Sequence, residues 1–230
     1  MPALFVTGTG TDIGKTYVSC ALIRALKARG AVVDAFKPVV SGFDPRDAAG
    51  SDPARLAAAL GDPGGVFRIA PRRYRAPLSP NIAARLEGET LVLDDMVIDA
   101  VARAAELRDG LLLVEGAGGV MSPLTDGETN LDMISALGAP VLLVAGSYLG
   151  TISHVLTALV ALRAANAQVA AVVISESLDA PDLAQTAQVL APFLSGASLF
   201  VAPRAESWDA GALADHLLAT LAPSAFGGTP

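Results

Sequence analysis

The sequence predicts an α/β fold in which a doubly wound, mainly parallel sheet is flanked by helices. Two patterns predict it. Short, unbroken apolar runs, of the kind that form strands buried on both faces, recur along the chain. Helical patterns lie between these runs, and such alternation is typical of a doubly wound domain. Because ligands bind at the carboxyl ends of the strands in such a sheet, we expect functional residues in the loops that follow the strands.

The predicted elements follow one another along the whole chain. Strands are expected at residues 3–7, 31–36, 111–114, 141–145, 169–174 and 198–201, and helices at residues 14–29, 53–60, 151–165 and 180–194. Residues 43–88 are richer in Pro, Gly and Arg and are expected to form a less regular insertion. No repeat or linker divides the chain, so we expect a single domain over residues 1–224 and a disordered tail over residues 225–230.

The composition limits the class of protein. Of the 230 residues, 52% are hydrophobic, which is enough for one large core. The net charge of −7 argues against a general nucleic-acid binder, which is usually basic. The one cysteine, Cys20, excludes an intrachain disulfide and predicts a cytoplasmic protein. Residues 133–162 carry no Asp, Glu, Lys or Arg, but glycines and a proline interrupt them, so we predict a buried strand and helix rather than a membrane span.

A glycine-rich loop follows the first predicted strand. It runs from Gly8 and ends in Gly14-Lys15-Thr16, which opens a helix as in the P-loop nucleotide-binding fold. Glycines let backbone N–H groups face phosphate oxygens, and the helix N-terminus adds partial positive charge. Lys15 is expected to reach the β- and γ-phosphates and Thr16 to ligate magnesium. The standard spacing needs glycine where this chain has Thr9, and the alternative is a strand-to-helix turn that binds nothing.

Polar residues also follow the second predicted strand. Lys37 lies at its carboxyl end, where a lysine can stabilise charge on a transferring phosphoryl or acyl group, and Ser41 can hydrogen-bond a substrate. A solvated surface lysine is an equally weighted alternative. Asp52 precedes a helical pattern, and its spacing favours a role as the cap of that helix, with magnesium ligation as the alternative.

The third loop follows the buried apolar run at residues 111–114. It begins with Glu115 and continues through the glycine-rich residues 116–119. An acid just past an apolar strand is the usual second element of a magnesium site in P-loop proteins, and glycines leave room for a nucleotide or substrate. A turn with an exposed glutamate is the alternative.

Together these loops resemble those of the dethiobiotin synthetases of biotin synthesis. The matching segments are residues 6–9 with Thr11 and 14–16, residues 37–39 with 41–42, residues 77–80, 114–119 and 149–150. The family shares the lengthened glycine spacing of the first loop. The resemblance implies an ATP- and Mg²⁺-dependent reaction of 7,8-diaminopelargonate with CO₂ or bicarbonate. It gives dethiobiotin through a carbamate and a carbamic–phosphoric anhydride.

The resemblance also implies roles for individual residues. Catalytic roles fall to Lys37, Lys15 and Thr11, and magnesium ligation to Thr16, Asp52 and Glu115. The implied nucleotide contacts are Asp12, Ile13, Gly14, Lys15, Thr16, Tyr17, Glu115, Gly116, Ala117, Gly118, Ser175 and Pro203. The implied diamine contacts are Thr11, Ser41, Leu149, Gly150, Thr151 and Ser153. The last four resemble the clamp that holds the distal carboxylate of the substrate across a homodimer.

Three positions depart from the family's usual pattern. Ser175 stands where an asparagine usually reads adenine, and because a hydroxyl offers less than an amide, relaxed base selectivity is our hypothesis. Ser153 replaces an asparagine of the carboxylate clamp. Asn81 stands where histidine often follows the proline.

The main alternative function is a partition or cell-division type ATPase, a dimerising switch with the same fold. Its loop carries a signature lysine near the first glycine, where this chain has Thr9-Gly10-Thr11. A related amide-forming synthetase for tetrapyrrole precursors would need an extra glutaminase domain, for which 230 residues leave no room. A regulatory nucleotide-binding module without catalysis is the third alternative, and Lys15, Lys37 and Glu115 together argue against it.

Overall fold

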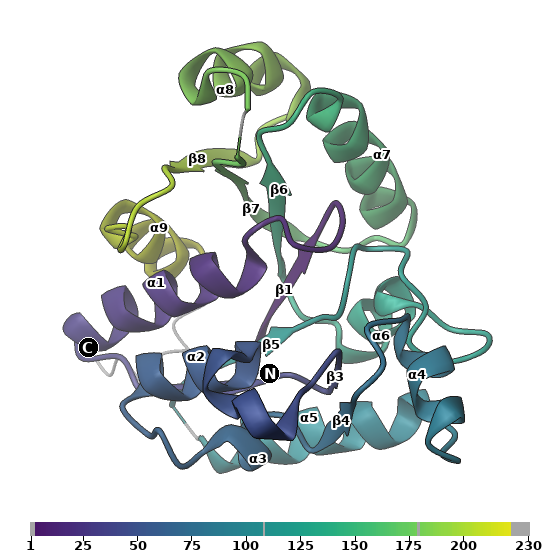
Figure 1. The fold of residues 1–230 in the computed structure, drawn as a ribbon. Coiled ribbons are helices and arrows are strands. Elements are labelled where there is room, and N and C mark those ends of the chain that lie inside the picture. Colours follow the sequence, from purple (N-terminus) through teal and green to yellow (C-terminus); the bar gives the residue numbers. More distant parts are fainter. Residues whose placement is uncertain (1–2, 108, 179, 222–230) are drawn as a thin grey trace.

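A six-stranded parallel sheet forms the centre of the molecule (Figure 1). The computed structural model describes residues 3–107, 109–178 and 180–221, so the predicted domain boundary at 224 and the predicted tail lie outside the described residues. The strands are β1 (Ala3–Gly8), β2 (Val33–Phe36), β5 (Leu111–Glu115), β6 (Val141–Gly146), β7 (Val169–Ser175) and β8 (Ser198–Ala202). Each neighbouring pair is parallel, which confirms the predicted fold class.

The strand order is β2-β5-β1-β6-β7-β8. The chain therefore places β5 between β1 and β2, and these two strands are not neighbours. Lys37 follows β2, so it reaches the loop after β1 across the end of β5 rather than from an adjacent strand. The acid that ends β5, Glu115, consequently lies between them.

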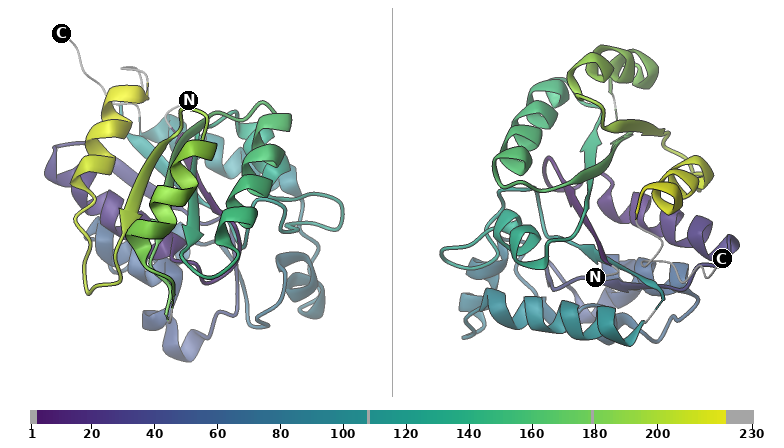
Figure 2. Two further views of the ribbon diagram at one scale, coloured as in Figure 1. Left: turned by 90° about the horizontal axis from the view of Figure 1, so that it is seen from above. Right: turned by 180° about the vertical axis from the view of Figure 1, so that it is seen from behind.

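Alternate residues of each strand face opposite sides of the sheet, and both sides are covered. Leu4 and Val6 pack with α1 (Lys15–Ala28), α2 (Asp52–Leu60) and α9 (Gly211–Thr220). Phe5 packs on the other side with α5 (Leu93–Glu106), α6 (Asn130–Leu137) and α7 (Thr151–Ala164). Figure 2 shows the two layers, with α1 beside α9 on one flank and α7 on the other. This double burial explains why the strands are continuous apolar runs.

Two local predictions need correction. Residues 43–88 are more regular than expected, because they contain η1 (Pro45–Gly50), α2, α3 (Val66–Ile69), β4 (Arg72–Tyr74) and α4 (Pro80–Leu86). β4 pairs in parallel with β3 (Val39–Ser41) in a second small sheet. The helix expected at 180–194 is shorter, because the Asp182 carboxylate caps α8 (Leu183–Leu190) by accepting from Gln185 N, and a 3₁₀ turn η2 (Ala191–Phe193) follows it.

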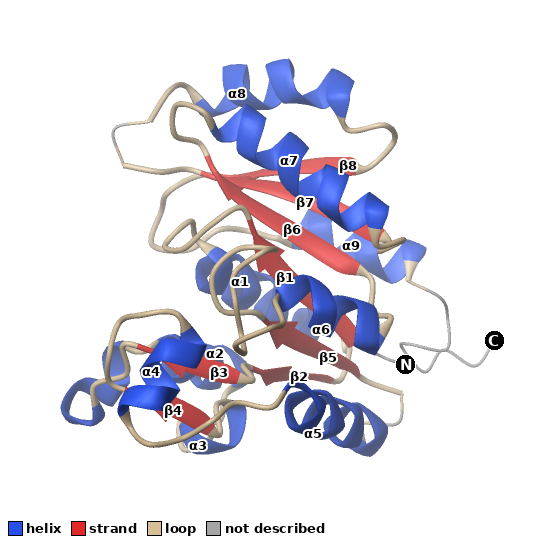
Figure 3. Ribbon diagram, turned by 90° about the vertical axis from the view of Figure 1, so that its right-hand side faces the viewer, coloured by secondary structure: helices blue, strands red, loops and turns tan. Residues whose placement is uncertain are grey.

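The parallel strands all end on one side of the sheet. Figure 3 shows their arrowheads pointing toward the side where the connecting loops and the β3–β4 pair gather. The loops after β1, β2, β5, β7 and β8 therefore meet at one edge, as the carboxyl-end rule predicts. No helix in residues 3–107, 109–178 and 180–221 is long and apolar enough to cross a membrane.

Candidate active site

The loop between β1 and α1 is closely packed, and its glycines are required by space and backbone angle. A Cβ on Gly8 would lie 2.5 Å from Ile13 Cδ1 and 3.0 Å from Val144 O. Gly14 has a φ of +94°, and a Cβ there would lie 2.4 Å from Ser175 Oγ. Larger side chains at either position would displace the loop, so its shape depends on both glycines.

Lys15 is the first residue of α1 and lies beneath this loop. It is 7% exposed, and its ammonium donates a hydrogen bond of 2.7 Å to Gly10 O. Burial, helped by the positive charge of Lys37, lowers the pKa of Lys15 to about 8. An anion bound in the loop would stabilise the charged lysine, so the site favours a phosphate ligand.

Glu115 joins three elements at the centre of the site. It is 1% exposed, and its Oε1 accepts hydrogen bonds from Thr16 Oγ1 at 2.6 Å and from Lys37 Nζ at 2.7 Å. Its Oε2 accepts from Ser19 Oγ at 2.7 Å. The alternative of an exposed glutamate in a turn is therefore wrong. Ser19 was not predicted, although its position one helical turn after Thr16 places both hydroxyls on one face of α1.

Lys37 is not the solvated surface lysine of the alternative interpretation. It is 3% exposed and lies between two carboxylates, 2.7 Å from Glu115 Oε1 and 2.8 Å from Asp52 Oδ2. Burial by itself would lower the pKa of Lys37, but the charges of Glu115 and Asp52 outweigh burial and raise it. The ammonium therefore stays charged, and the fold holds a cation where β2 and β5 end.

Asp52 is not the cap of α2, contrary to what its spacing favours. The Ser51 hydroxyl caps the helix and accepts from Ala54 N at 3.4 Å. Asp52 is the first residue of α2, and its partly exposed carboxylate accepts a hydrogen bond of 2.8 Å from Lys37 Nζ. Burial would raise the pKa of Asp52, but Lys37 outweighs burial and lowers it, so the carboxylate is charged at neutral pH.

The third loop packs directly on the first. A Cβ on Gly119 would lie 3.1 Å from both Gly10 N and Gly8 O, so a larger residue would push the two loops apart by a few tenths of an ångström. Asn130, the first residue of α6, is fully buried and donates through Nδ2 to Ala117 O at 2.7 Å and Gly119 O at 2.8 Å. Asn130 thus fixes the third loop, a role that only the folded chain reveals because 11 residues separate it from Gly119.

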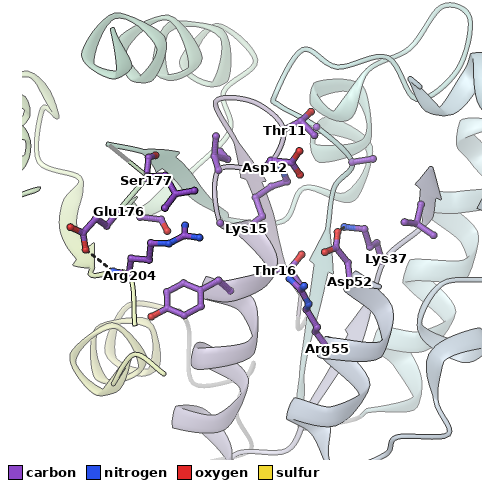
Figure 4. A pocket seen from close by; sticks show the side chains of 18 of the residues that line it. Thr11, Asp12, Lys15, Thr16, Lys37, Asp52, Arg55, Glu176, Ser177 and Arg204 are labelled. Atoms are coloured by element: carbon purple, nitrogen blue, oxygen red, sulfur yellow. Dashed lines mark hydrogen bonds and ion pairs between the residues drawn. The ribbon is translucent and has the colours of Figure 1, made fainter. Parts of the chain in front are cut away.

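These loops surround a cavity of about 690 Å³ (Figure 4). The predicted residues that line it are Thr11, Asp12, Ile13, Gly14, Lys15, Thr16, Tyr17, Lys37, Ser41, Asp52, Ala117, Gly118 and Ser175. Sequence reasoning did not place Val40, Arg55, Glu176, Ser177, Leu178, Arg204 and Ala205 in the site, although they also line it. Glu176 directly follows the end of β7, and Arg204 lies two residues past the end of β8, so the carboxyl-end rule was a signal that could have found them.

The other predicted site residues lie outside the cavity lining. Glu115 lies beneath its floor next to Gly116, and Pro203 O accepts a hydrogen bond of 2.9 Å from the Tyr17 hydroxyl. Residues 149–153 form the N-terminus of α7, where Leu149 is 91% exposed and Thr151 is buried. This segment does not line the described cavity, and its role across a dimer stays a prediction.

The oxygen atoms beneath the loop suit a magnesium ion that is shared with a nucleotide. No group of three His, Cys, Asp or Glu side chains that could hold a metal occurs in the described part of the chain. A phosphate-bound Mg²⁺ needs fewer protein ligands, because phosphate oxygens and water complete its shell. The Thr16 hydroxyl contacts Glu115, and Lys37 bridges Glu115 to Asp52, so three hard oxygen donors converge there. The donor set therefore fits Mg²⁺.

Sequence comparisons show which known proteins the chain is similar to. The model of a family described as an AAA domain matches residues 2–195. The chain is 90% identical, over all of both chains, to the ATP-dependent dethiobiotin synthetase BioD of Caulobacter sp. (strain K31). It is 62% identical to the protein of the same name from Caulobacter vibrioides (strain NA1000 / CB15N), over 95% of this chain and 100% of that one.

Solved structures support the fold. The chain is similar to the MinC:MinD cell division protein complex of Aquifex aeolicus, with a TM-score of 0.53 and 10% identity over 89% of this chain and 82% of that chain. It is also similar to a ParA family ATPase of Chlorobium tepidum TLS, with a TM-score of 0.51 and 13% identity over 98% and 96% of the two chains. At such low identity these structures support the fold and nothing more. The high identity over the whole chain shows instead that the protein belongs to the family of ATP-dependent dethiobiotin synthetases.

Proposed function

We propose that the protein converts 7,8-diaminopelargonate, CO₂ and ATP into dethiobiotin, ADP and phosphate. One amine attacks CO₂ and loses a proton to give a carbamate. A carbamate oxygen attacks the γ-phosphorus and ADP leaves. The second amine then attacks the carbamoyl carbon, closes the urea ring and expels phosphate. The observation that carries the proposal is the buried Lys37 at the edge of a phosphate-loop cavity, in a chain of this family.

The polar groups of the cavity suit this sequence of steps. Lys15 and Lys37 would offset the negative charge that spreads over the γ-phosphate and the carbamate. The hydroxyls of Thr11 and Ser41 line the same cavity and would hold the carbamate or the diamine by hydrogen bonds. Binding the reactants side by side removes much of the entropic barrier to a reaction of three substrates.

Magnesium belongs to the proposal as a bound ion. Thr16, Asp52 and Glu115 would hold it, and when bound it would neutralise phosphate charge. The fixed position of the Glu115 carboxylate, held by Ser19 on its other oxygen, would orient these ligands before the nucleotide arrives.

A homodimer would complete the substrate site. The N-terminus of α7, with exposed Leu149 and Ser153, presents backbone N–H groups of the kind that bind a carboxylate. We infer that it holds the distal carboxylate of a diamine in the partner's cavity. The family's chemistry needs only small cellular metabolites, and we infer a cytoplasmic location.

A partition or cell-division type ATPase is not favoured. The likeness to the MinD and ParA structures is at 10% and 13% identity and concerns the fold. The chain has Thr9-Gly10-Thr11 where that class carries its signature lysine.

The test is a product assay. The purified protein is incubated with 7,8-diaminopelargonate, bicarbonate, Mg²⁺ and ATP, and dethiobiotin is detected by mass. We expect product only when all four are present, and its loss in Lys37→Ala. Lys27→Ala, which removes the same charge from the exposed end of α1, should retain activity. ATP hydrolysis without dethiobiotin would instead favour the switch ATPase.

A further inference from the structure

Arg55 lines the cavity and has no role in the function proposed above. Two arginines line this cavity. Arg55 lies at the end formed by Thr16, Lys37 and Asp52, which we call the phosphate end, and Arg204 comes from the opposite end, beside Glu176. Within residues 3–107, 109–178 and 180–221, neither guanidinium forms an ion pair or a hydrogen bond with another side chain. A cavity-facing arginine without a carboxylate partner is available to an anionic ligand.

The helix directs Arg55 toward the magnesium ligands. Arg55 follows Asp52 by three residues on α2, so both side chains lie on one face of that helix. In Figure 4 the Arg55 side chain rises from α2 toward Thr16 and lies beside Asp52. Its charge also adds, after that of Lys37, to the lowering of the Asp52 pKa. The guanidinium therefore acts on the same small region as the predicted metal ligands.

The other cations of this region already have partners inside the protein. Lys37 is bound to Asp52 and Glu115, and Lys15 to Gly10 O. A nucleotide triphosphate carries its extra negative charge on the γ-phosphate, which a diphosphate lacks. Lys15 keeps two N–H groups for a phosphate, and Arg55 adds a whole guanidinium that no described side chain occupies.

We propose that Arg55 binds the γ-phosphate of the nucleotide and so distinguishes the triphosphate from the diphosphate. The planar guanidinium offers paired N–H donors that match two phosphate oxygens, which a lysine cannot do. The inference rests on the proposed function in one respect only, namely that the cavity binds ATP. It does not require that the diamine is the second substrate.

The test compares the affinities of two nucleotides. Dissociation constants for ADP and for the non-hydrolysable β,γ-imido analogue of ATP are measured by calorimetry with Mg²⁺ present. Arg55→Ala should weaken binding of the analogue on the order of tenfold, as expected for loss of a charge-assisted hydrogen bond, and change ADP affinity less than about twofold. Arg55→Lys should recover only part of the loss because it keeps the charge without the paired donors.

Two further arginine variants serve as controls. Arg46→Ala removes the same charge from η1, where the side chain is 90% exposed and outside the cavity lining, and should leave both affinities unchanged. Arg204→Ala removes a guanidinium from the opposite end of the cavity and should affect ADP and the analogue alike. Thermal melting checks that each variant is folded.

Either of two results would overturn the role of Arg55. Unchanged affinity for the analogue in Arg55→Ala would mean that the guanidinium does not reach the nucleotide, and an equal loss for ADP and the analogue would place its contact elsewhere. The result is separable from the proposed function. A protein that binds the analogue through Arg55 but makes no dethiobiotin would refute the proposed reaction and leave this inference intact. A protein that makes dethiobiotin, and whose affinity for the analogue is unchanged in Arg55→Ala, would refute this inference and leave the reaction intact.

Discussion

The two ends of the cavity differ in how firmly the fold fixes them. At the phosphate end, Lys37 and Glu115 are almost wholly buried, and each charge has a partner from another element. At the opposite end, Arg204 is exposed on the loop after β8, and its backbone N–H is held by the Glu176 carboxylate at 2.7 Å. The fold therefore fixes the residues around the phosphates by burial and ion pairs, and it holds the residues at the opposite end, where a base would lie, less firmly.

The largest expected effect concerns Cys20, one helical turn beyond Thr16 at the buried end. Burial, followed by the charge of Glu115, raises the pKa of the Cys20 thiol to about 12. A higher pKa lowers the thiolate fraction at a given pH, although each thiolate is then more nucleophilic. With the added effect of burial, modification by a disulfide reagent at pH 8 should be on the order of 100-fold slower than for an ordinary cysteine. Comparing rates in buffer and in guanidinium tests this, and rapid reaction of the folded protein would show that the phosphate end opens.

The buried charge pair gives the next largest effect. Lys37→Met leaves Glu115 without its cation and should cost about 3 kcal/mol in the free energy of unfolding, measured with urea. Lys37→Met combined with Glu115→Gln should cost clearly less than the sum of the single variants, because the uncompensated charge is gone. Lys27→Met, at an exposed site, is the matched control. Additive losses would mean that the pair is not coupled.

A smaller effect is expected for Asn130, which positions the third loop. Asn130→Asp keeps the shape but replaces both Nδ2 donors to Ala117 O and Gly119 O by an acceptor. We expect affinity for Mg-ATP to fall on the order of tenfold and amide exchange at residues 118–120 to accelerate. Ser135→Ala, on the exposed face of the same helix, should change neither. Slow exchange in Asn130→Asp would contradict the positioning role.

The smallest effect is expected for the choice of nucleotide base, which we assign to the end of the cavity at Ser175. Ser175 is 5% exposed and its hydroxyl packs against Gly14, so it offers little to a base edge. We expect turnover with ATP, CTP and GTP to agree within about tenfold, because one hydroxyl discriminates less than an amide. Ser175→Asn should increase the preference for ATP. A strong preference for ATP in the unchanged protein would refute relaxed selectivity.

The sequence was informative where function depends on local pattern. The strands, the loop ending in Gly14-Lys15-Thr16, and Glu115 after a buried strand follow from short stretches of chain, and the fold class is confirmed. The neighbours of Glu115 could not be predicted in the same way. Thr16 is 99 residues away and Lys37 is 78 residues away, so their contacts depend on strand order.

Some errors arose because local rules compete. Both Ser51 and Asp52 are good N-cap residues, and only the position of Lys37 decides that Ser51 caps α2 while Asp52 enters the site. The sequence places Arg55 in a helix, and the residues next to it in the chain do not indicate that its side chain lines a cavity.

The position of β5 between β1 and β2 has a consequence for how the site is made. Chains are synthesised from the N-terminus, and domains fold as units. β1 and β2 leave the ribosome first, yet among the strands that the structure describes, β2 pairs with β5, and β1 pairs with β5 and β6. After its own synthesis, β2 must wait about 75 residues, from Phe36 to Leu111, for the strand that joins it to β1, and β1 must wait about 100 residues, from Gly8 to Leu111. The phosphate loop and Lys37 are thus translated long before the carboxylate that unites them, and the centre of the site cannot form until β5 has been made.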